Sequence, residues 1–187
     1  EEDGIYLLGN SMFKTGIDVQ LLDNSLPNDL VGFEYHNGHY TNLWYLIAKS
    51  ALPDIQEVPS VVVWGYRPRY ALDPAFRQNR LNATDLFAID DPLYNSLSSS
   101  GEVTNGGAGD FIAGPFKSFN EGYIPRTAEA IADLGIPQVV IIWRPVAAAT
   151  GELSNAEINF VSDSLEYFAE NAIPVLNLFD DEEIGID

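Results

Sequence analysis

The stretch IYLLGNSMFKTGID, residues 5–18, decides how the chain folds. It opens with an apolar run of strand length, continues through the small or polar Gly9, Asn10 and Ser11, and then becomes compatible with a helix. In open parallel α/β sheets, ligands bind beyond the carboxyl ends of the strands, and the first strand normally flanks that point. We therefore expect Ser11 to face a cleft. Taken alone, the motif is better explained by a turn or a helix cap, and the rest of the chain favours the cleft.

Five apolar runs of strand length alternate with polar, helix-compatible segments. They cover residues 5–8, 30–35, 60–64, 138–143 and 174–179. Because their apolarity is continuous rather than alternating, we expect the strands to be covered on both faces. The alternation predicts an α/β fold, a three-layer sandwich around a mainly parallel sheet. We expect a flavodoxin-like five-stranded sheet in the order 2-1-3-4-5.

Three of the helices predicted between these runs have a recognisable start or end. One begins at Ser154, which has capping-box spacing with Glu157. A second covers about residues 42–51 with Thr41 as its cap, and a third ends at Gly135. The spacing of apolar residues predicts that the first of these helices buries Ile158, Val161, Leu165 and Phe168.

Length and composition exclude several classes of function. With 187 residues, 46% of them hydrophobic, the chain is expected to form one domain over residues 1–187. Cysteine is absent, which excludes disulfides, thiol nucleophiles and cysteine metal sites. The net charge of −19 disfavours nucleic acids and anionic membranes as partners. An acidic chain that is poor in lysine suits high salt, and an ordinary acidic protein explains it equally well.

The sequence carries no signal peptide and no apolar run long enough for a membrane helix. It begins almost directly at a strand. We therefore expect a signal or membrane anchor to lie outside residues 1–187, and the domain to be truncated at both ends.

Polar residues follow the second, third and fourth runs. His36, Asn37, Gly38 and His39 come after the second, and arginines follow the other two. The two histidines have no third ligand, so we expect no metal site. The arginines could hold a carboxylate, a sulfate or a developing oxyanion, or they could pair with the surrounding carboxylates.

These motifs together resemble the SGNH (GDSL-like) hydrolase superfamily. The resemblance rests on Gly9-Asn10-Ser11, on Gly38, on Gly65 and on a fifth strand that leads into an acidic C-terminus. It is closest to a divergent extracytoplasmic branch that includes domains involved in polysaccharide O-acetylation. The resemblance implies an extracytoplasmic location and a serine esterase or O-acyltransferase that acts on an acylated carbohydrate or a similar ester, without a cofactor.

The resemblance also assigns roles to residues. Ser11 would be the nucleophile, and the backbone N–H groups of Ser11 and Gly38 would form the oxyanion hole. Substrate or anion contacts would come from Asn10, Asn37, His36, His39, Arg67 and Arg144.

The chain departs from the family pattern in three places. Asn10 replaces the aspartate beside the serine, Arg67 stands where an asparagine donor is expected, and no Asp-x-x-His follows the fifth strand. The base could lie beyond Asp187, which we favour and on which the enzyme assignment depends. Alternatively, the domain could be a non-catalytic binding or assembly module, or His36 or His39 could serve as the base.

Overall fold

Strands and helices alternate along the chain, and the strands form a parallel sheet. The structure, a computed structural model, describes residues 4–10, 17–25, 30–36, 41–55, 58–68, 119–143 and 155–179. The predicted α/β fold class is confirmed. The strands are β1 (Ile5–Asn10), β2 (Leu30–His36), β3 (Val61–Tyr66), β4 (Gln138–Trp143) and β5 (Val175–Leu178).

The sheet runs in the order β2-β1-β3-β4-β5, and every neighbouring pair is parallel. The strand order reverses between β1 and β3, because β2 lies on one side of β1 and all later strands lie on the other. The carboxyl ends of β1 and β3 therefore mark the position where open α/β sheets usually bind ligands.

Three strands extend further than their apolar runs. β1 includes Gly9 and Asn10, β2 includes His36, and β3 includes Gly65 and Tyr66. These residues were expected after the strands. They continue the strands because ladder hydrogen bonds to a neighbouring strand do not require an apolar side chain.

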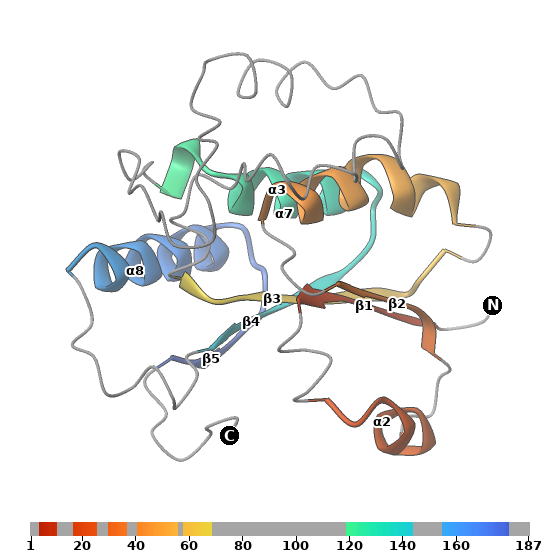
Figure 1. The fold of residues 1–187 in the computed structure, drawn as a ribbon. Helices are drawn as coiled ribbons and strands as arrows, with labels where there is room; N and C mark the ends of the chain where they lie inside the picture. The colour runs from red at the N-terminus through yellow and green to blue at the C-terminus, as the bar shows by residue number, and fades with distance from the viewer. Residues whose placement is uncertain are drawn as a thin grey trace, which may run out of the picture.

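Helices lie on both faces of the sheet. Figure 1 shows α3, α7 and α8 over one face and α2 over the other. Their bounds are Val19–Ser25 for α2, Thr41–Leu46 for α3, Tyr123–Asp133 for α7 and Asn155–Glu170 for α8. Shorter helical turns cover Ile47–Ala51, Leu52–Asp54 and Phe119–Glu121.

The predicted helix ends agree with the structure in two cases. The helix expected over residues 42–51 is α3 continued by a π-helical turn that ends at Ala51 as predicted, whereas Thr41, the predicted cap, is its first helical residue. The chain leaves α7 at Gly135, whose φ of +71° is a left-handed conformation that glycine adopts readily. Ser154, the predicted cap of α8, lies outside the described residues.

β1, β3 and β4 have buried or partly buried side chains on both faces, as their continuous apolarity predicted. The prediction was wrong for β5, where Leu176 is 49% exposed, because β5 lies at the edge of the sheet. The larger core includes Leu8, Trp64 and Ile142 and lies on the side of α3, α7 and α8. On the opposite face, Leu7 and Trp143 are buried and the partly buried Leu22 of α2 belongs to the same cluster.

The predicted buried face of α8 was wrong at one position. Ile158 is 47% exposed, whereas Phe160, Val161, Ser164 and Phe168 are buried. The reason is an aromatic cluster: Phe160 and Phe168 both pack edge-on against Phe119. Burying Phe160 turns the helix so that Ile158 faces away from the sheet.

Candidate functional site

Two of the predicted site residues end neighbouring strands. β1 ends at Asn10 and β2 ends at His36, and these two residues are register partners in the parallel ladder. Gly9 and Tyr35 are partners one step earlier. Neighbouring strands lie about 4.8 Å apart. The backbone therefore brings Asn10 and His36 together at the carboxyl edge of the sheet.

β3 brings Arg67, a third predicted site residue, to the same edge. Its register with β1 ends at the Leu8–Trp64 pair, so the last two residues of β1 are not paired with β3. Gly65 is buried and pairs with Ile141 of β4. Arg67 follows the last residue of β3 and is half-buried.

Tyr66 closes β3 but faces the core rather than the solvent. Its side chain is fully buried, and its ring packs edge-on against Phe160 at 6.2 Å between centroids. Burial raises the pKa of the Tyr66 phenol, and the neighbouring Ser164 hydroxyl offsets only part of that shift. Tyr66 therefore remains a neutral phenol near pH 7 and cannot act there as a general base.

The other predicted site residues lie outside the described residues. They are Ser11, Asn37, Gly38, His39 and Arg144. The nucleophile and the oxyanion hole therefore stay predictions, as does the convergence of Ser11, Gly38 and Gly65 at the carboxyl edge. The structure gives the backbone positions of Asn10 and His36.

The described part of the chain was also compared with what a metal site and a membrane-spanning helix require. Among those residues, no group of three or more histidine, aspartate and glutamate side chains could hold a metal ion. In the same segments, every helix is too short or too polar to cross a membrane.

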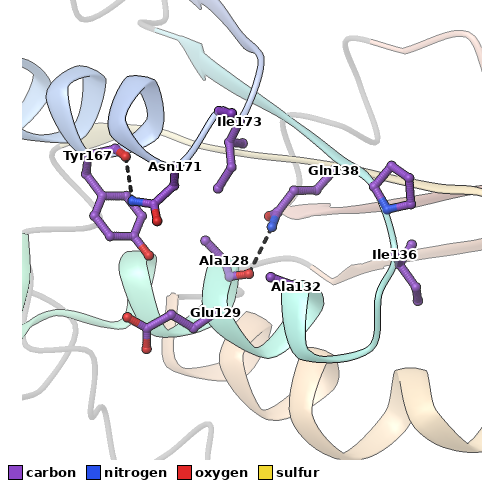
Figure 2. Close-up of a pocket in the computed structure, with 10 residues that line it drawn as sticks. Ala128, Glu129, Ala132, Ile136, Gln138, Tyr167, Asn171 and Ile173 are labelled. Atoms are coloured by element: carbon purple, nitrogen blue, oxygen red, sulfur yellow. Dashed lines mark hydrogen bonds between the residues drawn. The ribbon is translucent and has the colours of Figure 1, made fainter.

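A pocket lies at the opposite edge of the sheet, where the sequence pattern indicated no site. It has a volume of about 300 Å³ and lies between the end of α7, the start of β4 and the end of α8 (Figure 2). The only sequence signal was Gln138, a polar residue that opens an otherwise apolar run. The lining residues are Ala128, Glu129, Ala132, Ile136, Pro137, Gln138, Tyr167, Asn171, Ala172 and Ile173.

Comparisons with known proteins do not assign the chain to a family. No protein-family model matches it, and no curated protein is similar enough to count as a relative.

Proposed function

We propose that this chain is an SGNH-like serine esterase or O-acyltransferase that acts on an acylated carbohydrate or a similar ester. The observation that carries the proposal is the register pair of Asn10 and His36 at the carboxyl edge. In the sequence, Ser11 follows Asn10, and Asn37 and Gly38 follow His36. The proposed nucleophile and the proposed oxyanion donor are thus the continuations of two neighbouring strands.

The strand order gives further support. We propose a flavodoxin-like three-layer sandwich, because the order β2-β1-β3-β4-β5 and helices on both faces are what that arrangement requires. In such a sheet, ligands bind at the carboxyl ends of the strands beside the reversal in strand order. Ser11 directly follows the strand that borders this reversal.

The proposed reaction proceeds through an acyl-enzyme. A base takes the proton of the Ser11 hydroxyl while its oxygen attacks the ester carbonyl carbon. The N–H groups of Ser11 and Gly38 donate to the oxyanion that develops on the carbonyl oxygen. The C–O bond to the alcohol then breaks, and the alcohol leaves with a proton from the base. In the second half of the reaction, the base takes a proton from water or a sugar hydroxyl, whose oxygen attacks the acyl carbon. The bond from that carbon to the Ser11 oxygen breaks, and the base returns the proton to Ser11.

Two sources of the base are compatible with this proposal. One is an Asp-x-x-His pair in a natural chain that continues past Asp187. The other is a histidine of the β2 segment, His36 or His39, and the pairing of His36 with Asn10 supports testing it. Arg67 at the end of β3, and Arg144 after β4 in the sequence, are proposed to hold an anionic group of the substrate.

The alternative proposal is an SGNH-like module that binds or assembles without catalysis. Two departures from the family pattern within the chain support it: Asn10 replaces the aspartate beside the serine, and Arg67 stands where an asparagine donor is expected. In both proposals, the domain acts outside the cytoplasm, and a membrane anchor would belong to a part of the protein outside residues 1–187.

Covalent labelling of Ser11 tests the proposal. We expect a fluorophosphonate to modify Ser11, detected by peptide mass spectrometry, because only an activated serine reacts readily. Hydrolysis of an aryl acetate and of acetylated oligosaccharides should fall by at least about 100-fold in Ser11→Ala. Ser25→Ala is the matched control. The Ser25 hydroxyl is exposed on α2 and donates to the Leu21 carbonyl, so its loss should leave activity unchanged.

The histidine variants locate the base. Loss of labelling in His36→Gln or His39→Gln would assign the base to the β2 segment. Labelling only in a longer natural chain would assign it to an Asp-x-x-His. A serine that stays unlabelled in both chain lengths, together with inert behaviour on every ester, would contradict catalysis and leave the binding module.

A further inference from the structure

The pocket at the amino edge of the sheet is distinct from the proposed catalytic site. Its lining includes Gln138, the first residue of β4, and Ile173, which precedes β5, whereas Asn10 and His36 end their strands. Its volume of about 300 Å³ is at the small end of the range for ligand pockets. The site therefore has room for a small organic molecule.

The polar groups of this pocket offer acceptors rather than cationic donors. None of the ten described residues that line it is basic. Asn171 uses Nδ2 to donate to the Tyr167 carbonyl at 2.8 Å, which leaves its side-chain oxygen as an acceptor. Gln138 is occupied at both ends, because Oε1 accepts from Trp64 and Nε2 donates to the Ala128 carbonyl.

A carboxylate and an aromatic side chain lie near one another at one side of the pocket (Figure 2). Figure 2 shows the Tyr167 ring extending from α8 toward α7, where Glu129 projects. The Tyr167 hydroxyl donates to the Pro125 carbonyl at 3.3 Å. Burial, followed by the Glu129 charge, raises the pKa of the Tyr167 hydroxyl. Arg126, one turn before Glu129, donates from Nη1 to the Gly122 carbonyl.

Two helix C-termini add to the negative potential. α7 ends at Asp133 and α8 ends at Glu170, and residues near both ends line the pocket. Neither helix has a basic residue in its last turn. Because the C-terminus of a helix carries partial negative charge, cations are favoured beside it. The remaining walls are apolar and consist of Ala128, Ala132, Ile136 and Ile173.

We propose that this pocket binds a small organic cation, an ammonium group carried on an apolar body. The ammonium would lie between the Glu129 carboxylate, the Asn171 side-chain oxygen and the face of the Tyr167 ring. Carboxylates, amide oxygens and aromatic faces all attract such a group. The apolar body would contact the alanine and isoleucine side chains. This site does not involve Ser11, so its occupancy is independent of the proposed catalysis.

NMR titration of the ¹⁵N-labelled 187-residue chain tests this inference. The probe is phenethylammonium, compared at constant ionic strength with neutral 2-phenylethanol and anionic phenylacetate. We expect saturable shifts in the amides of the lining residues with phenethylammonium, and much weaker shifts with the other two. Equal binding of the neutral alcohol, or shifts elsewhere without shifts at the pocket, would overturn the proposal.

Variants separate the pocket from the overall charge of the protein. Glu129→Gln should weaken phenethylammonium binding by about three- to tenfold. Glu166→Gln removes the same charge from an exposed position on α8 that does not line the pocket, and should leave binding unchanged. Ser11→Ala should also bind normally. An equal loss in Glu129→Gln and Glu166→Gln would show general attraction to a chain of net charge −19 and would overturn the site.

Discussion

The indole Nε1 of Trp64 donates a 2.9 Å hydrogen bond to Oε1 of Gln138, and both side chains are buried. The other end of the amide, Nε2, donates to the Ala128 carbonyl at 2.9 Å. Gln138 thereby connects β3 and β4 to α7. A buried N–H is costly to leave without an acceptor, so this one glutamine satisfies a polar group that Trp64 brings into the core.

Replacing Gln138 by methionine should destabilise the fold. Methionine keeps a similar volume but leaves the Trp64 N–H without its acceptor, which costs about 1–3 kcal/mol of the free energy of unfolding. Denaturation in urea would measure this change. In a Trp64→Phe background, the same substitution should cost much less, because the donor is already gone. Equal costs in both backgrounds would mean that the hydrogen bond does not account for the loss.

The apolar runs located the strands because burial on both faces produces a long continuous signal. The position of Gln138 in a strand was predicted, but its hydrogen-bond partner Trp64 is 74 residues away in the sequence. Sequence patterns do not specify such long-range contacts. The same limit applies to Ile158, whose exposure depends on how Phe160 packs against Phe119.

The sequence predicted a candidate site at the carboxyl edge of the sheet but none at the amino edge. Asn10 and His36 were each predicted to contact the substrate, and they lie together because neighbouring parallel strands end at one edge of the sheet. The amino-edge pocket was missed, since Glu129, Gln138 and Tyr167 come from three separate elements and form no motif in the sequence.

Tyr66 should make the protein lose stability above pH 10. Burial raises its pKa in the folded state above the ordinary value of 10.0, so the unfolded chain loses the proton first as the pH rises. Below pH 10, both states hold the proton and the pH has no effect through this group. Above pH 10, the unfolded state binds fewer protons, and the free energy of unfolding falls.

Tyr66→Phe isolates this contribution. Relative to the native chain, the variant should gain about 1.4 kcal/mol in the free energy of unfolding between pH 8 and pH 11. Urea denaturation at the two pH values measures it. Tyr167→Phe is the comparison, and should gain less because Tyr167 is only half-buried. A Tyr66→Phe variant that follows the native chain at both pH values would contradict the assignment.

Two residues with a left-handed backbone conformation follow helices, one a glycine and the other an alanine. Exchanging glycine and alanine at the two positions should change stability in opposite directions. Gly135 has a φ of +71° after α7, and Ala172 has a φ of +54° after α8. Gly135→Ala should cost about 1 kcal/mol, because a side chain disfavours this conformation even where space is open. Gly135→Asn should cost less, since asparagine tolerates the conformation better.

Ala172→Gly should stabilise the protein by about 0.5–1 kcal/mol. The substitution relieves the left-handed strain while keeping the hydrogen bond from Ile173 N–H to the Phe168 carbonyl. Ala169→Gly is the matched control, because Ala169 is also exposed but lies within α8, where glycine should destabilise. Thermal denaturation of the two variants should therefore shift in opposite directions, and a shift in the same direction would argue against strain at Ala172.

The acidic charge should make stability depend on salt. The net charge is −19, and carboxylates that repel one another in the folded state are screened as ionic strength rises. The melting temperature should therefore increase from dilute buffer to molar potassium chloride. An uncharged osmolyte at the same concentration is the control for effects other than screening.

Repulsion between carboxylates can also be tested on a single surface of α8. Asp163, Glu166 and Glu170 are exposed and spaced three and four residues apart, so their charges repel one another along the helix. Glu166→Lys turns both repulsions into attractions and should raise the free energy of unfolding by about 0.5–1 kcal/mol in dilute buffer. Molar salt should remove most of this gain, because it screens exposed charges. If the melting temperature of the native chain does not change with salt, the high-salt interpretation has no support. If Glu166→Lys gains the same stability at both salt concentrations, lysine acts through helix propensity or packing rather than through charge.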